Sequence, residues 1–431
     1  MTFASAVSAD TASPTAPMHA ESPAAPPYAE LRERFAPVLA HIAEGAVERD
    51  RTRRLPHEEV RALAEAGFTA LTVPTSYGGS GADIETFFRL LIDLGEADSN
   101  LPQLLRAHFA FVNDFLIGIE EGDPADWFTR IAQGAVFGNA SHERSSAVVG
   151  DLATTVTATD GEYRLSGEKH YSTGSIFADW INVSARTPDG GRARVTVGST
   201  AAGVDIRDDW DGFGQILTGS GSTLFTDVSV PATHVRVLEG RGDGAPTTQT
   251  SFLQLVLLAS LAGAGRAALR DGIDFVRSRT RVYSQGSGAS AAADPLVQQV
   301  VGRLSAKVAS AQDAVLAAAR ALAAAQAAVG TEDHERLTDA AELRTVQAQI
   351  TAVEDVLSVT TELFEVGGAS ATSRGRSLDR HWRNARTLSS HNPVIYQERA
   401  IGDRLLNGTD LLYFWSTGQE RTGGTTQTAS R

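Results

Sequence analysis

The sequence predicts an α+β protein that is mainly helical, with an N-terminal helical domain, a middle β-barrel or sandwich domain and a C-terminal four-helix bundle. Three observations predict this fold. Apolar residues first recur at helical spacing, then alternate between turns placed roughly every ten positions, and finally return to long, Ala-rich helical patterns. The 431 residues leave room for all three domains, which we place at residues 28–134, 135–245 and 246–431.

Composition narrows the class of function. The formal net charge is -14 at pH 7, which argues against nucleic-acid or membrane-surface partners because both favour basic patches. The chain has no cysteine, so disulfides, thiolate metal sites and cysteine nucleophiles are excluded. Residues 1–27 are rich in Ala, Ser, Thr and Pro and do not resemble a signal peptide, so we expect a disordered tail. No run reaches the roughly 18 uncharged apolar residues of a membrane span, and we expect a cytoplasmic protein.

The first domain is predicted to be helical throughout. Pro56 suits a first helical turn, and Gly67 suits the position just after a helix. The glycine-rich stretch from Tyr77 to Gly81 is expected to be a loop. The expected helices are Ala29–Arg49, Pro56–Ala66, Asp83–Leu94, Leu101–Ile119 and Pro124–Ala132.

The middle and last domains differ in the period of their apolar residues. Short alternating segments indicate strands at Thr154–Ala158, Tyr163–Leu165, Trp180–Ala185, Arg192–Val197, Thr223–Phe225 and His234–Leu238. After a Gly-rich joint, four long helical patterns favour an up-and-down bundle. They cover Phe252–Thr280, Leu296–Val329, Asp333–Glu365 and Val394 to about Phe414.

The stretch Ser377–Pro393 concentrates arginine, histidine and asparagine, and we expect chemistry to converge there. Arg383 and Arg386 would share a helix face, where guanidinium groups suit carboxylate or phosphate. His391 precedes Asn392-Pro393, where a helix is expected to end. The alternative is a solvated, arginine-rich turn.

Common catalytic motifs are missing or misplaced. Gly263–Ala268 matches a dinucleotide fingerprint but lies inside a helical pattern, so we read it as small residues at a helix crossing. No His, Asp and Glu group has the spacing of a metal site. Gly219-Ser220-Gly221 is only superficially close to a nucleophile elbow.

Two segments of the β domain could instead hold a flat cofactor. Lys169–Ser175 ends a strand with Tyr171 followed by Ser172 and Thr173, a ring for stacking and hydroxyls for hydrogen bonds. Phe137–Ser141 could be a loop whose glycine lets backbone approach a ligand. Each could equally be an ordinary hairpin end or loop, and a lone histidine such as His108 is more often a satisfied core residue than a catalyst.

Taken together, these features resemble the acyl-CoA dehydrogenase superfamily over Tyr28 to the end of the chain. KHYSTGS resembles its aromatic-x-Thr-x-Gly segment, which implies that Tyr171 and Thr173 meet a flavin, and FGNAS implies the same for Asn139 and Ser141. VRSRTRVYSQG resembles the segment that reaches a flavin phosphate across a subunit interface, here through Arg279 or Arg281. EVGGAS resembles the cofactor-lining glycine motif, which implicates Gly367, Gly368 and Ser370.

HWRNART, followed by a histidine at position 391, is more specific and resembles the dibenzothiophene monooxygenase group. These enzymes take reduced FMN from a separate reductase and use O2, through a flavin C4a-hydroperoxide, to oxygenate sulfur or nitrogen. The resemblance places His391 near flavin C4a, Thr173 beside it, Asn139 on the ring and His108 on the substrate side. Thr173 stands where the sulfur-oxidising members are expected to have serine.

The residues favour an oxygenase over a dehydrogenase. A dehydrogenase needs a carboxylate base at the substrate, yet Ser251–Ala268 carries no acid and His391 stands where a glutamate would be needed. Together with this choice, the resemblance implies an FMN-dependent monooxygenase without a metal that forms a homotetramer and acts on sulfur of a small, largely apolar substrate. The alternatives are N-hydroxylation by the same mechanism, an FAD-dependent acyl-CoA dehydrogenase or oxidase, and a non-catalytic scaffold.

Overall fold

The N-terminal part of the chain is helical, as predicted. The computed structural model describes residues 25–119, 124–144, 152–159, 161–238 and 247–413, so nearly all of the expected tail lies outside the described residues, as does the joint at 239–245. The first helices are α1 (Tyr28–Thr52), α2 (His57–Glu65), α3 (Ile84–Ala97), α4 (Asn100–Leu104), α5 (Arg106–Leu116) and α6 (Ala125–Ala132).

Aromatic packing joins these helices to the bundle. Phe87 of α3 stacks on Phe252 of α7 (Thr248–Ser278) with ring centroids 5.7 Å apart, and it meets Phe109 of α5 edge to face at 4.9 Å. All three rings are buried, and such pairs add to the stabilisation from area burial. The expected single helix Leu101–Ile119 is broken at Leu105 into α4 and α5.

The middle domain is one mixed sheet of eight strands. Its order is β6-β7-β3-β2-β4-β5-β8, and β1 pairs parallel with β4 off this path. The expected loop Phe137–Ser141 is mostly strand β1, which the sequence hides because a short parallel strand that is buried on both faces shows no alternation. The strands are β1 (Phe137–Ala140), β2 (Thr155–Thr159), β3 (Glu162–Lys169), β4 (Trp180–Arg186), β5 (Arg192–Gly198), β6 (Val204–Ile206), β7 (Thr223–Val230) and β8 (Val235–Leu238).

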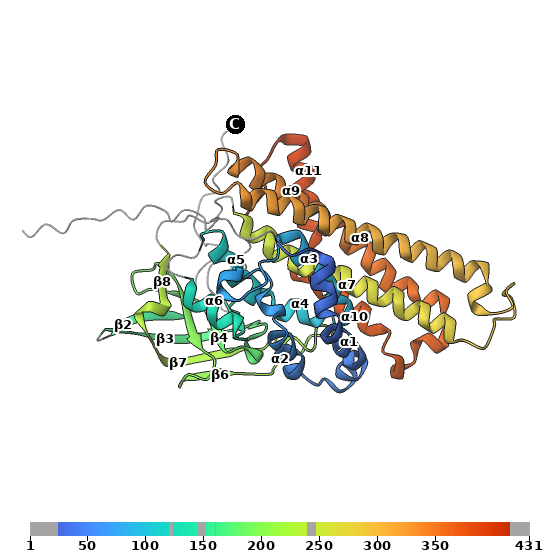
Figure 1. Ribbon diagram of the computed structural model, residues 1–431, viewed down its shortest axis with the longest axis horizontal. Coiled ribbons are helices and arrows are strands. Elements are labelled where there is room, and N and C mark those ends of the chain that lie inside the picture. The colour runs from blue at the N-terminus through green and yellow to red at the C-terminus, as the bar shows by residue number, and fades with distance from the viewer. Residues whose placement is uncertain (1–24, 120–123, 145–151, 160, 239–246, 414–431) are drawn as a thin grey trace, which may run out of the picture.

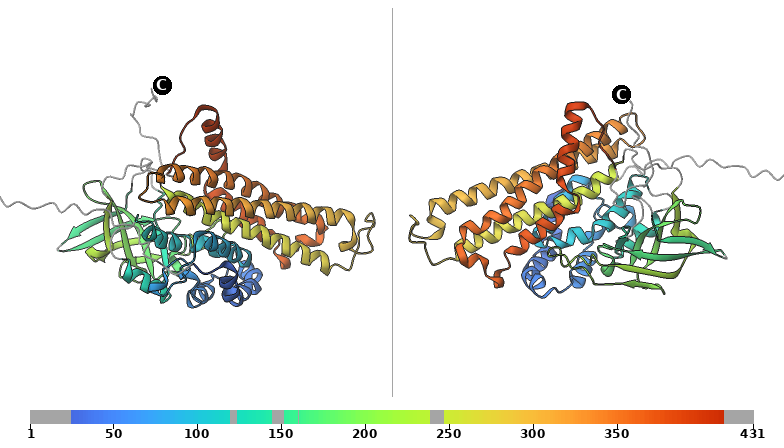
Figure 2. Two further views of the ribbon diagram at one scale, coloured as in Figure 1. Left: turned by 45° about the horizontal axis from the view of Figure 1, so that its top comes forward. Right: turned by 180° about the vertical axis from the view of Figure 1, so that it is seen from behind.

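Long helices α7, α8 (Pro295–Ala327) and α9 (His334–Glu362) form the bundle, which extends away from the sheet (Figure 1). The helix expected over Val394 to about Phe414 is present over Val394–Asn407, but its expected place as the fourth helix of the bundle is wrong. Helix α10 (Asp379–His391) packs against α7 and α9, whereas α11 (Val394–Asn407) contacts α9 and stands away from the bundle (Figure 2). Apolar periodicity did not predict that α10 belongs to the bundle, because most of its buried side chains are polar.

Within the described part of the chain, α7 and α8 are long and apolar enough to cross a membrane by length and composition alone. The most apolar window of α7 is 83% buried inside the protein. Packing against neighbouring helices therefore accounts for the apolar character of α7.

Candidate active site

The segment after β3 forms one wall of the candidate site. Tyr171 has a positive φ of 57°, which turns the chain so that the backbone N–H of Ser172 donates to Gly221 and that of Gly174 donates to Thr218. The Thr173 hydroxyl lies 2.8 Å from the Ser220 hydroxyl, which in turn lies 2.7 Å from Thr218 Oγ1. Sequence reasoning missed Ser220, although its Gly-Ser-Gly context had drawn attention for another reason.

Strand β1 brings Asn139 to the same place. The Ser175 hydroxyl donates to the backbone carbonyl of Asn139 at 2.9 Å, which ties β1 to the segment carrying Thr173. The Ser141 hydroxyl donates to Asn139 Oδ1 at 2.6 Å. This fixes the orientation of the amide and leaves its N–H groups without a partner in the described part of the chain.

Helices α5 and α10 close the site from the other side. Gly174 packs so tightly on the α4–α5 break that a Cβ there would lie 2.1 Å from the Leu104 carbonyl oxygen. Two residues further on, Arg106 Nη1 lies 3.3 Å from Nε2 of His391 at the end of α10, and Arg106 Nε donates to Leu253 at 2.9 Å. Thr173 and His391 therefore flank the same break between α4 and α5.

Hydrogen bonding fixes the state of His391. A guanidinium can only donate, so Nε2 accepts from Arg106 and the proton is on Nδ1, which faces Asn392 Oδ1 at 3.3 Å. Asn392 is oriented by donating from Nδ2 to Gln254 at 2.6 Å. Solvent reaches the imidazole although protein surrounds it on most sides, and this desolvation, together with the Arg106 charge, lowers the pKa of His391 to about 3. His391 is neutral at physiological pH.

The site is electropositive. Burial lowers the pKa of Arg106 to about 10, which leaves it charged at neutral pH. Burial and the charges of Lys169 and His170 lower the pKa of His142, and His142 in turn contributes to the low pKa of His391. The sequence analysis did not identify Arg106. The one feature that could have indicated it is the position of a charged residue within the largely apolar segment LLRAHFAF.

Other side chains already contact the ring of Tyr171. The Arg144 guanidinium lies 4.8 Å from the ring centroid and donates to the Tyr171 hydroxyl at 3.2 Å. Trp210 meets the ring edge to face at 6.1 Å and is a further aromatic group that sequence reasoning missed. A flat ligand can stack on Tyr171 only on the face that Arg144 leaves open.

His108, which the sequence predicted on the substrate side, is buried between neighbouring segments in this structure. The side chain is 0% exposed, with Nε2 2.8 Å from the Thr69 carbonyl and Nδ1 accepting from the Phe137 backbone N–H at 3.2 Å. Burial lowers its pKa to about 4. Nδ1 joins α5 to β1 and Nε2 joins α5 to Thr69, so both ring nitrogens are engaged within the protein.

The remaining predicted flavin contacts gather at the opposite end of α7. Arg279 Nη1 donates to Val366 at 2.9 Å, and the Ser370 hydroxyl donates to Gly367, next to Gly368. Arg281 is exposed just beyond. About seven helical turns separate Leu253 from Arg279, which is roughly 40 Å, so one chain does not bring this group to Thr173.

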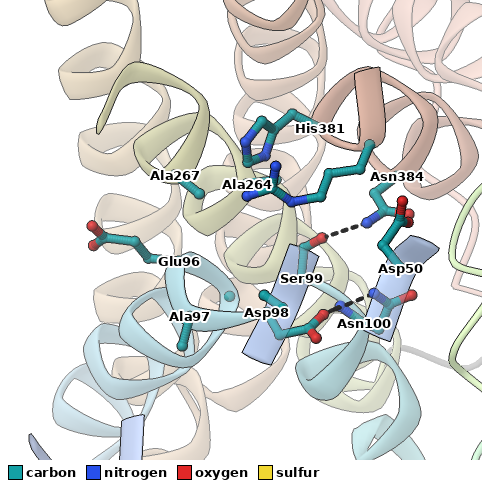
Figure 3. A pocket seen from close by; sticks show the side chains of 13 residues that line it. Asp50, Glu96, Ala97, Asp98, Ser99, Asn100, Ala264, Ala267, His381 and Asn384 are labelled. Atoms are coloured by element: carbon teal, nitrogen blue, oxygen red, sulfur yellow. Dashed lines mark hydrogen bonds between the residues drawn. The ribbon is translucent and has the colours of Figure 1, made fainter. Parts of the chain in front are cut away.

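The arginine-rich part of α10 is used within the protein. Arg383 pairs with Asp50 of α1 at 2.6 Å, while Arg380 and His381 both contact Asp271 of α7. Beside them lies a polar recess of ≈ 20 Å³, where the Ser99 hydroxyl accepts from Asn384 (Figure 3). It has room for a water molecule or two and is far too small for a flavin. Of the predicted residues in this stretch, only His391 reaches the candidate site.

The donor set fits a flavin. The ring of a flavin has a polar edge of carbonyl and N–H groups, which the Asn139 amide and the Thr173 and Ser220 hydroxyls can match. Among the described residues, no group of three or more His, Cys, Asp or Glu side chains could hold a metal ion.

Comparison with known proteins identifies the family. Residues 29–134 match the model of the acyl-CoA dehydrogenase N-terminal domain, and residues 255–395 match that of the C-terminal domain. A dibenzothiophene monooxygenase of Rhodococcus qingshengii is 30% identical over 383 residues, covering 84% of this chain and 90% of that protein. The chain belongs to the acyl-CoA dehydrogenase superfamily.

Within this superfamily, its relatives include FMN-dependent monooxygenases. SfnC of Pseudomonas putida, a probable FMNH2-dependent monooxygenase, is 28% identical over 90% of this chain and 96% of its own. Crystal structures of FMN-bound TdsC from Paenibacillus sp. A11-2 and of the methanesulfinate monooxygenase MsuC from Pseudomonas fluorescens superpose with TM-scores of 0.80 and 0.79. TdsC is 26% identical, and the alignment covers 89% of this chain and 98% of TdsC. MsuC is 27% identical, and the alignment covers 88% of this chain and 97% of MsuC.

Proposed function

We propose that this chain is the oxygenase of a two-component system that uses reduced FMN and O2 to oxygenate sulfur in a small molecule. One observation carries the proposal: a neutral His391 and the hydrogen-bonded hydroxyls of Thr173 and Ser220 lie on either side of the break between α4 and α5. Among the described residues, no carboxylate is bonded to His391 or Arg106 there. Full-length similarity to FMNH2-dependent and sulfur-oxidising enzymes supports it.

Each residue has a role in this proposal. Reduced FMN, when bound, would supply the electrons that activate oxygen. Asn139 would donate to the polar edge of the ring, and Thr173, oriented by Ser220, would hydrogen-bond beside it. Nε2 of His391 carries no proton and accepts from Arg106, so it would be available to accept a hydrogen bond at the transferred oxygen once the Arg106 guanidinium turns to a bound ligand.

Assembly into a homotetramer is part of the proposal. Arg279 follows the C-terminal end of α7, and Gly367, Gly368 and Ser370 lie beside it, so this group is too far away to reach the flavin held by Thr173 of the same chain. A second copy can bring them to that flavin, where Arg279 or Arg281 would meet the phosphate. We further propose a cytoplasmic location and a separate flavin reductase as partner.

The test is reconstitution with FMN, NADH and a flavin reductase, and measurement of oxygenated product and hydrogen peroxide. Methanesulfinate and dibenzothiophene are suitable first substrates because related enzymes carry these names. Sulfur-oxygenated product formed only with reduced flavin supports the proposal. Product from an amine instead would point to N-hydroxylation. Reduction of an electron acceptor by acyl-CoA without any reductase would establish a dehydrogenase, and failure to bind FMN or FAD would favour a scaffold.

A further inference from the structure

We propose that Arg106 is a docking site for an anion, and that the substrate of this enzyme carries an acid group, such as a sulfinate, sulfonate or carboxylate, that binds the guanidinium beside His391. This inference rests on the proposed oxygenase function. It replaces the largely apolar substrate expected from sequence with a small organic anion.

Arg106 has no carboxylate partner among the described residues, unlike three other arginines of low exposure near the site. Its Nε donates to the Leu253 carbonyl and its Nη1 to His391, both neutral acceptors. Within the described chain no carboxylate lies in ion-pair distance of it, and an arginine has five N–H donors to satisfy.

Other arginines of low exposure in the same region each face a carboxylate. Arg49 contacts Glu59 and Asp98 at 3.0 and 2.9 Å. Arg380 and Arg383 face Asp271 and Asp50 in the same way. Arg106 therefore differs from these three arginines in having no carboxylate partner among the described residues.

The electrostatic cost of this arrangement favours an anion. A cation taken out of water without a counter-charge is destabilised, and burial accordingly lowers the pKa of Arg106. Burial, together with the charges of Lys169 and His170, also lowers the pKa of His142, so a further cation beside this site is disfavoured. An acid group at Arg106 would restore the missing counter-charge and use the free N–H donors of the guanidinium.

The position of Arg106 favours the substrate over the flavin phosphate as the source of that anion. The ring is expected between Asn139 and Thr173, and Gly174 of that segment touches Leu104, two residues before Arg106. The phosphate of FMN is separated from the ring by a five-carbon chain, so it lies away from the group that meets His391. An acid bound by Arg106 would hold the oxidisable atom beside His391.

The experiment compares a matched pair of probes, benzenesulfinate and methyl phenyl sulfoxide, which have similar shapes and differ in charge. Isothermal titration calorimetry with the oxidised protein, with and without saturating FMN, measures binding without turnover. We expect wild type to bind benzenesulfinate at least 10-fold more tightly than the sulfoxide. Arg106→Gln should weaken sulfinate binding on the order of 10- to 100-fold and leave the sulfoxide unchanged, while Arg106→Lys should retain part of the preference. Arg336→Gln, at an exposed surface ion pair, is the matched control and should behave as wild type.

Three results would overturn the inference. The first is a result in which the wild-type protein binds the uncharged sulfoxide as tightly as it binds benzenesulfinate and methanesulfinate. The second is equal sulfinate affinity in wild type and Arg106→Gln. The third is a loss of FMN affinity in Arg106→Gln with the sulfinate preference intact, which would assign Arg106 to the flavin. Failure of wild type to bind FMN at all would refute the proposed function separately, because sulfinate binding is measured without FMN as well.

Discussion

The structural role of His108 can be tested through its proton. The folded-state pKa is about 4, below the ordinary value of 6.5, so protonation favours the unfolded chain. The stabilisation from neutral His108 is complete above pH 6.5 and is lost as the pH falls toward 4. Between pH 7 and pH 5 the loss from this one residue amounts to about 2 kcal/mol.

His108→Gln should change stability in two ways. It removes the acceptor of the Phe137 N–H, which costs about 1–3 kcal/mol at pH 7 if that buried donor stays unpaired. It also removes the titrating group, so the difference in unfolding free energy between pH 7 and pH 5 should shrink by about 2 kcal/mol.

Urea unfolding followed by tryptophan fluorescence, at both pH values and one protein concentration, measures these differences. His41→Gln replaces an exposed histidine of α1 and should leave both quantities unchanged. An identical pH dependence in wild type and His108→Gln would refute this reasoning. So would normal stability with a selectively raised KM, because that result would return His108 to the substrate pocket.

Three further variants test other parts of the molecule. His391→Ala should still bind FMN but release several-fold more hydrogen peroxide per product formed, and an unchanged ratio would remove His391 from the mechanism. Arg49→Met should lower the unfolding free energy by about 3–5 kcal/mol, seen as a reduced urea midpoint, because Asp98 stays buried without its cation and Glu59 keeps only Arg54. A loss below about 1 kcal/mol would contradict that ion pairing. Arg279→Gln should weaken FMN binding in a fluorescence titration while sedimentation still shows the wild-type assembly, and unchanged affinity would exclude Arg279 from the cofactor site.

The sequence predicted those features that depend on local pattern. Helices α7 to α9 and most strands follow from apolar spacing, and Asn139 and Thr173 were named from short motifs. What the sequence could not predict depends on contacts between distant segments. The break at Leu105 has no local signal, because its tight contact is with Gly174. The sequence of helix α10 has no apolar pattern, and its packing could not be predicted because Arg383 pairs with the carboxylate of Asp50, which lies near the other end of the chain.

The carboxylates around the site are already engaged, and this separates the oxygenase from a dehydrogenase. Glu143 pairs with Lys169 at 2.6 Å and accepts from two backbone N–H groups. Glu342 accepts from the Thr250 and Ser251 hydroxyls at the start of α7, and burial raises its pKa, which favours a protonated acid over a base. Neither can take a proton from carbon without breaking the contacts that hold a strand end or a helix start. His391, in contrast, is a neutral imidazole that solvent can reach, and its pKa of about 3 makes it a weak base, so it suits hydrogen bonding to oxygen and not removal of a proton from carbon.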